Sequence, residues 1–192
     1  MSIAKDRQFL EMAEVVSKRS KCSSRSIGAV IVKDGSVVSE GYNGSPRGIS
    51  LCQDPTVECR RRTMGYGSGE GLEHCPAVHA EANAIAQAAR NGIAVKDCTL
   101  YCWCCVPCKN CVGLIINAGI NRVVCLDEPL YDQMGFEMLV EAGVELNRWD
   151  EDRNGMWVPF NSYCAAPGYY PLGRIYYDDD FNIIYEARFA GA

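Results

Sequence analysis

The chain has 192 residues, of which 48% are hydrophobic and 22% charged, as is usual for a globular protein that buries a core. Its net charge of −5 argues against a large polynucleotide-binding surface, yet a single nucleotide needs only a local basic pocket. No apolar run approaches membrane-spanning length, and the N-terminal residues lack the apolar stretch of a signal peptide. We therefore expect a cytoplasmic protein with no membrane partner, whose cysteines are metal ligands or buried thiols rather than disulfides.

The first part of the chain is predicted to form a helix and a hairpin. Residues 5–18 carry apolar side chains at helical spacing, with the charges elsewhere on the cylinder, which predicts an amphipathic helix. Two apolar segments, 27–32 and 37–41, flank the turn signal Asp34-Gly35. Such an arrangement predicts a β-hairpin.

A loop rich in Gly, Asn, Ser and Pro follows at residues 41–48, and this composition is typical of a shaped turn region. From there to residue 78 no convincing regular element is predicted. A stretch of this length is uncommon in a compact domain unless it is functional or is held by a staple. The run Arg60–Arg62 is expected to face solvent or to help to bind a triphosphate. Five potential metal ligands lie in or near the stretch: Cys22, Cys52, Cys59, His74 and Cys75.

The remainder of the chain, as far as residue 149, alternates between helices and short apolar strands. This alternation after one hairpin predicts an α/β fold with a mixed sheet of about five strands and helices on its faces. Residues 150–192 are rich in Tyr, Gly and acidic residues and are expected to form a C-terminal extension with a hairpin. The predicted helices are 80–90, 108–118 and 132–142, the strands 99–102, 122–126 and 144–148, and the hairpin strands 174–177 and 182–185.

Two short motifs are predicted to hold a metal ion: H-A-E at residues 79–81 and P-C-K-N-C at residues 107–111. His79, Cys108 and Cys111 offer one imidazole and two thiolates, a three-ligand zinc set whose fourth position stays open, as in catalytic zinc sites. Both motifs lie where a helix is predicted to begin, and a helix N-terminus favours the thiolate form of cysteine. Glu81 need not bind the metal, and a free carboxylate beside a zinc-activated water is a general acid and base.

Of the three overlapping C-x-x-C pairs in this stretch, the position of Pro107 favours Cys108 and Cys111 as the metal ligands. Cys102/Cys105 and Cys105/Cys108 have the same C-x-x-C spacing, but Pro107 suits the start of a helix that places Cys108 and Cys111 on one face. A structural zinc knuckle with a surface glutamate remains the alternative, although it would supply only three ligands and leave the glutamate without a role.

With these motifs placed, the chain resembles the deoxycytidylate deaminase branch of the zinc-dependent cytidine deaminase superfamily over roughly residues 5–148. The H-x-E and P-C-x-x-C halves are the signature of zinc nucleobase deaminases. The G-Y-N-G-S-P loop at residues 41–46 resembles the nucleotide-specific branch, whereas free-cytidine deaminases typically have cysteine in place of His79. The resemblance implies a three-layer cytidine-deaminase-like fold for residues 1–149.

The activity that this resemblance implies is hydrolysis of dCMP to dUMP and ammonia, which supplies dUMP for thymidylate synthesis. Glu81 would move the protons, and Asn43 would bind the deoxyribose hydroxyl, with Ala80 also expected at the substrate. The monophosphate requires cationic donors, for which Arg is the suited residue. The arginine candidates are Arg25, Arg47 and Arg90. A polynucleotide or tRNA base deaminase and a non-catalytic zinc-binding scaffold remain the rival functions.

The resemblance also implies regulation. In the family the loop holding Gly41, Tyr42, Asn43 and Gly44 helps to form an effector site in a hexamer, where dCTP with Mg²⁺ activates and dTTP inhibits. We therefore expect a homo-oligomer of this kind, with an unregulated enzyme as the alternative.

A second, structural zinc is expected as the staple of the irregular stretch. By position against the family, its ligands would be Cys22, Cys52 and Cys75, with His74 or Cys59 as the fourth. Buried free thiols are the alternative.

One stretch departs from the family pattern Y-x-T-x-x-P-C. Here residues 101–108 read Y-C-W-C-C-V-P-C, which is one residue longer and lacks the threonine. The extra residue is expected to be absorbed by a bulge at the strand end, and the departure leaves open which side chains face the base.

Overall fold

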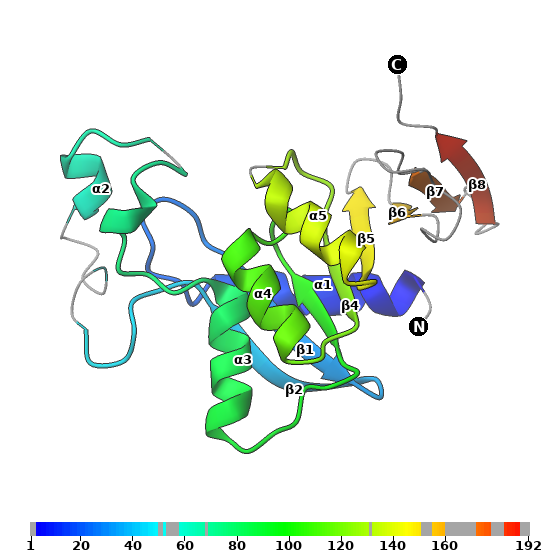
Figure 1. Ribbon diagram of the computed structural model, residues 1–192, viewed down its shortest axis with the longest axis horizontal. Helices are drawn as coiled ribbons and strands as arrows, with labels where there is room; N and C mark the ends of the chain where they lie inside the picture. Colours follow the sequence, from blue (N-terminus) through cyan, green and yellow to red (C-terminus); the bar gives the residue numbers. More distant parts are fainter. Residues whose placement is uncertain are drawn as a thin grey trace.

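A computed structural model describes residues 3–49, 52, 58–67, 69–130 and 132–150, together with the backbone of strands 155–159, 172–177 and 183–188. The described part forms five helices, one 3-10 turn and eight strands (Figure 1). In chain order these are α1 (Ile3–Ser17), β1 (Gly28–Lys33), β2 (Ser36–Tyr42), α2 (Arg60–Thr63), the 3-10 turn η1 (Leu72–His74), α3 (Ala80–Arg90), β3 (Thr99–Cys102), α4 (Lys109–Asn117), β4 (Arg122–Leu126), α5 (Gln133–Glu141), β5 (Glu145–Asp150), β6 (Gly155–Pro159), β7 (Leu172–Tyr177) and β8 (Ile183–Arg188).

The strands form one mixed sheet in the order β2-β1-β3-β4-β5-β6-β7-β8. Its centre is parallel, since β3 pairs with β4 and β4 with β5 in that sense, whereas β1 runs antiparallel to both β2 and β3. The five strands predicted up to residue 149 are all present, and the α/β architecture with a mixed central sheet is confirmed. The predicted C-terminal hairpin is β7 and β8, and β6 joins it to the edge of the same sheet, which therefore has more strands than the five expected.

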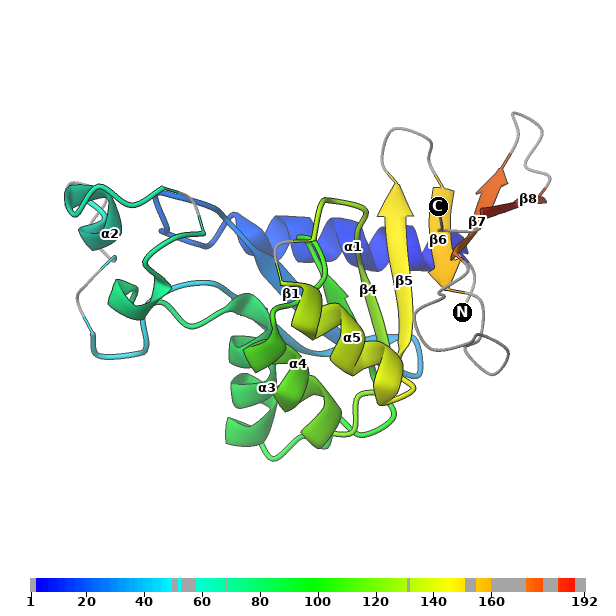
Figure 2. The same cartoon turned by 45° about the horizontal axis from the view of Figure 1, so that its top comes forward.

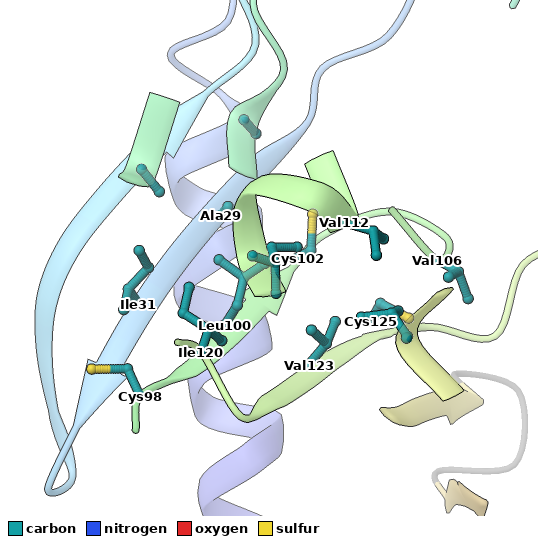
Figure 3. Packing of buried hydrophobic residues seen from close by; sticks show 14 of the residues in the cluster. Ala29, Ile31, Cys98, Leu100, Cys102, Val106, Val112, Ile120, Val123 and Cys125 are labelled. Carbon is teal, nitrogen blue, oxygen red and sulfur yellow. The ribbon is translucent and has the colours of Figure 1, made fainter. Parts of the chain in front are cut away.

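Two apolar cores give the fold three layers. The larger core lies between the sheet and α3, α4 and α5, and Figure 3 shows Ile31, Leu100 and Val123 of neighbouring strands on this face together with Val112 of α4. The smaller core packs one face of α1 against the other side of the sheet. Figure 2 shows α1 on one side of the sheet and α3 to α5 on the opposite side. Buried Asp6 of α1 also accepts hydrogen bonds from Tyr101 and Arg122, at 2.6 and 2.7 Å, which ties the helix to β3 and β4.

Among its described residues, the stretch between β2 and α3 contains two short elements, α2 and η1, where no regular element was predicted. Its two ends are joined, because Gly44 and Val78 exchange backbone hydrogen bonds of 3.1 and 2.8 Å. Close packing of β2 on α3 fixes this end of the sheet. A Cβ at Gly41 would lie 2.3 Å from the Ala80 carbonyl oxygen, so only glycine allows the two backbones to approach this closely.

No helix in the described ranges is long and apolar enough to cross a bilayer.

Candidate active site

The three predicted metal ligands come together at two helix N-termini. His79 is the N-cap residue of α3 and Cys108 that of α4, while Cys111 lies in the first turn of α4. The His79 Nδ1 atom lies 3.5 Å from each of the two sulfur atoms, and all three ligand atoms lie within 4.8 Å of one another. One nitrogen and two sulfurs in this arrangement fit three corners of a zinc tetrahedron and leave the fourth open.

The fold holds the Cys108 segment from the side of α5. The Asp132 carboxylate caps α5 by accepting from the Gly135 N–H at 3.2 Å, and it also accepts from the Lys109 N–H at 2.9 Å. A Cβ at Gly135 would lie 2.4 Å from the Pro107 carbonyl oxygen, so α5 touches the backbone that carries the ligand. Pro107 precedes the N-cap instead of opening the helix, which shifts the predicted start of α4 by about one residue.

Glu81 lies in the first turn of α3 and is only 3% exposed. Its Oε2 atom has no hydrogen-bond partner among the described residues, so a buried carboxylate oxygen is left for a group that the protein itself does not supply. Burial raises the pKa of Glu81 above its usual value, because desolvation disfavours the charged form. The hydrogen bond to the Cys108 sulfur raises the pKa of His79. The sulfur therefore favours positive charge at the place where the metal ion would lie.

A cavity of about 190 Å³, the active-site cavity, opens onto His79 and Glu81. Its wall includes Arg25, Asn43 and Arg61, which lie far apart in the sequence. The full lining is Cys22, Ser24, Arg25, Ile27, Asn43, Arg61, Gly69, Leu72, Cys75, Ala77, His79, Glu81, Cys104, Cys105 and Pro107.

Of the three predicted phosphate-binding arginines, the structure brings only Arg25 to the active-site cavity. Its guanidinium donates to Glu128 at 2.7 Å, and this contact raises the pKa of Arg25. Asn43 is 6% exposed and shapes the same wall. Its Oδ1 atom accepts from the Ile27 N–H and its Nδ2 atom donates to the Arg25 carbonyl oxygen, both at 2.8 Å. The asparagine therefore fixes the backbone that presents the arginine.

A larger cavity of about 610 Å³, the arginine cavity, lies beside the same helix α3. Arg47 and Arg90 line it, as do Gly41, Tyr42 and Gly44, three of the four predicted effector residues; the fourth, Asn43, lines the active-site cavity. Its full lining is Arg19, Glu40, Gly41, Tyr42, Gly44, Ser45, Pro46, Arg47, Val78, Asn83, Ala86, Gln87 and Arg90.

One arginine behaves differently from the sequence prediction. Arg61, expected to face solvent or a triphosphate, is 6% exposed and donates to the carbonyl oxygens of Gly67 and Glu70, both at 2.5 Å. It lines the active-site cavity, and no local signal separates it from Arg60 and Arg62, which are exposed. Ala80, expected at the substrate, is fully buried in the core between the sheet and the helices.

The candidate ligands of the second zinc are close in space but do not form a compact set. Cys75, Cys59 and Cys22 all act electrostatically on Cys52, whose pKa is raised first by burial and then by these three thiols. Within the described part of the chain, only two other groups have three ligand atoms within 4.8 Å of one another. The His74 ring stacks on Tyr66 with 5.6 Å between the ring centres. We favour Cys59 over His74 as the fourth candidate, because Cys59 is one of the three thiols that act on Cys52.

Comparison with known proteins agrees with this site. Residues 3–127 match the cytidine and deoxycytidylate deaminase zinc-binding region. The deoxycytidylate deaminase of Enterobacteria phage T4 is 32% identical over 187 residues, covering 81% of this chain and 96% of the phage protein. That of Schizosaccharomyces pombe is 35% identical over 152 residues, covering 79% of this chain and 46% of the yeast protein.

Solved structures give the same result. The dCMP deaminase of cyanophage S-TIM5, in complex with dCMP and dUMP, matches with a TM-score of 0.63 at 27% identity, covering 77% of this chain and 98% of that chain. The chain spans less than half the length of the yeast relatives that it matches. The matched region nevertheless contains both metal motifs and the cavity around them, and on these grounds the chain belongs to the cytidine and deoxycytidylate deaminase family.

Proposed function

We propose that the chain is a zinc-dependent hydrolase that converts dCMP and water into dUMP and ammonia. The observation that carries this proposal is Glu81, a buried carboxylate with an unpartnered oxygen, which lies beside the three-ligand metal site and lines the active-site cavity. The cyanophage relative solved with dCMP and dUMP supports the choice of substrate.

His79, Cys108 and Cys111 would hold the zinc ion, which when bound lowers the pKa of water and so supplies the nucleophile for C4 of cytosine. Glu81 would accept a proton from the attacking water and deliver it to N3 of the base. It would then take the proton of the new C4 hydroxyl and pass it to the amine, which leaves as ammonia while C4 becomes a carbonyl. Its raised pKa suits both steps, because a carboxyl group that is too acidic would not return the proton.

Arg25 would bind the 5′-phosphate, since of the three candidates it alone lines the active-site cavity. Asn43 keeps one amide N–H beyond its bond to the Arg25 carbonyl, and this group would donate to the deoxyribose hydroxyl. The product would serve thymidylate synthesis, and the location would be cytoplasmic, where nucleotide substrates are found.

Ammonia release from dCMP, deoxycytidine, dCTP and single-stranded DNA tests the proposal. We expect turnover of dCMP and a much lower kcat/KM for the other three. Equal rates on single-stranded DNA would indicate a polynucleotide deaminase instead, and no turnover of any substrate by zinc-loaded protein would indicate a non-catalytic scaffold.

We further propose a structural zinc bound by Cys22, Cys52, Cys59 and Cys75. The electrostatic effect of the other three thiols on Cys52 supports it, and side-chain rotation would bring the sulfur atoms together around the ion. Metal analysis of fully loaded protein should give two zinc ions per chain, and Cys52→Ser should reduce the value to one. A single zinc in the unmodified protein would show that these cysteines are free thiols.

We also propose that the arginine cavity is an effector site. Gly41, Tyr42, Gly44, Arg47 and Arg90 surround enough space for a nucleoside triphosphate, and the arginines supply the charge. As the family resemblance implies, dCTP with Mg²⁺ would activate, dTTP would inhibit, and the enzyme would be a homohexamer. Initial rates against dCMP concentration should be sigmoid, straightened by dCTP with Mg²⁺; identical hyperbolic curves under all conditions would contradict regulation.

A further inference from the structure

The stretch that departs from the family pattern places two thiols directly behind the active site. Cys102 ends β3 and Cys104 follows two residues later, and their sulfur atoms lie 3.2 Å apart. Both are buried, with exposed fractions of 0% and 5%. Cys102 belongs to the core between the sheet and the helices (Figure 3), so its neighbours hold it in place.

Glu81 completes this pair to a group of three. One carboxylate oxygen of Glu81 and the two sulfur atoms lie within 4.8 Å of one another, and all three residues are buried. The Glu81 Oε2 atom is unpartnered among the described residues, so a buried carboxylate oxygen of this group of three is available to a further ligand. Cys104 lines the active-site cavity, so a small ion that enters the cavity reaches the pair without unfolding the core.

We propose that Glu81, Cys102 and Cys104 form a second, inhibitory metal site for a thiophilic divalent cation, next to the catalytic centre. Thiolate ligands select zinc and other soft or borderline metals over magnesium and calcium. Binding would release the two thiol protons to solvent, one of which Cys104 donates to the Cys105 carbonyl oxygen at 3.1 Å in the empty site. The two thiolates and one carboxylate carry three negative charges against the two positive charges of the ion.

Occupation of this site would stop catalysis through Glu81. A carboxylate bound to a cation no longer accepts or returns the substrate proton, and the ion also fills space beside the base. The inhibition rests on the deaminase function proposed above, whereas binding of the ion does not.

Zinc binding to the holoprotein tests the site directly. Protein already loaded at its tight sites is titrated with Zn²⁺ against a chromophoric chelator. We expect the unmodified protein to bind one additional equivalent of Zn²⁺, more weakly than at its tight sites. The affinity for this additional ion should be at least tenfold lower in Cys102→Ala and in Cys104→Ser. Cys98→Ala is the matched control, because Cys98 is equally buried in the same core but outside the group, and it should bind like the unmodified protein.

A second measurement uses Cd²⁺, whose sulfur-to-metal absorbance reports thiolate ligation. The additional equivalent should increase this absorbance in the unmodified protein and in Cys98→Ala, and not in the two variants of the pair. The two variants are independent, so if one fails to fold by circular dichroism the other still decides. Binding that is equal in all four proteins, or absent from the unmodified one, would overturn the proposal.

Inhibition is measured as the rate at saturating dCMP against free Zn²⁺, each protein relative to its own rate without excess zinc. The zinc concentration for half inhibition should rise at least tenfold in Cys102→Ala and Cys104→Ser. Additional zinc that binds to the pair without slowing turnover would contradict the inhibitory role. If no protein turns over dCMP, the deaminase proposal fails while the binding measurements still decide whether the site exists.

Discussion

The two cavities beside α3 are built in different ways. The active-site cavity uses the first turn of the helix, where His79 and Glu81 are presented to buried thiols and the carboxylate has lost its contact with water. The arginine cavity uses the side of the helix that ends with Arg90, and its cationic side chains lie at the protein surface. One helix thus contributes to two sites of opposite chemical character.

The contrast between the two cavities agrees with the direction of the α3 helix dipole. Partial positive charge at the N-terminus stabilises thiolates and carboxylates, whereas partial negative charge at the C-terminus favours cations such as Arg90 in the last turn. Burial adds to the contrast, because charges interact more strongly in the enclosed site than at the surface. Substitutions in the active-site cavity should therefore change rates by larger factors than those in the arginine cavity.

The largest effect is expected for Glu81→Ala. General acid–base catalysis contributes about 10²–10⁴-fold, so kcat should fall by at least that factor while zinc stays bound. His79→Ala should lose activity and catalytic zinc together. Steady-state rates and metal analysis on the same samples check both statements, with exposed Glu137→Ala as the control. More than a few per cent of residual activity in Glu81→Ala would mean that another group moves the proton.

Arg25→Ala should affect recognition of the phosphate. A hydrogen bond to a charged group is worth about 1.5–3 kcal/mol, so KM for dCMP should rise by roughly tenfold to more than a hundredfold. KM for deoxycytidine should change little, since it offers no phosphate. Arg47→Ala, in the arginine cavity, is the matched control. An equal rise for both substrates would point to a distorted site.

Gly135→Ala tests whether packing of α5 holds the metal ligands. Its Cβ would meet the Pro107 carbonyl oxygen at 2.4 Å, so the ligand segment or α5 has to shift, at a cost of about 1–3 kcal/mol. Zinc affinity measured by chelator competition should fall about tenfold. Gly113→Ala is the control, because a Cβ there meets nothing within 4 Å and alanine favours the helix. Unchanged affinity in Gly135→Ala would mean that the ligands do not depend on α5.

The smallest effect is expected for Arg90→Ala in the arginine cavity. Loss of one exposed contact should weaken binding of dCTP with Mg²⁺ by about tenfold, which corresponds to about 1.4 kcal/mol. KM for dCMP should change less than in Arg25→Ala. Calorimetric titration of both variants with the triphosphate gives the comparison. A larger loss of dCMP recognition in Arg90→Ala would reverse the assignment of the two cavities.

The sequence predicted the parts of the site that depend on local structure. The places of His79, Glu81 and the cysteine pair at helix starts follow from neighbouring residues, and the structure has them there. The contrast between Arg25 and Arg90 was not predictable, because it depends on which cavity the segment before β1 and the end of α3 each reach in the folded chain. Arg61 was missed for a different reason, since its side chain is held by the carbonyl oxygens of Gly67 and Glu70, several residues further along the chain.

The paired hydrogen bonds between Gly44 and Val78 have a consequence for how this protein tolerates change in length. The segment between them starts and ends at one point of the folded chain, so its ends stay fixed when its length changes. Each doubling of a flexible closed loop costs only about 0.6 kcal/mol of entropy. Insertions placed away from the cysteines and from the residues that line the active-site cavity should thus be accepted without moving β2 or α3. A new peptide or reporter domain would therefore be inserted into the protein at such a place between Gly44 and Val78.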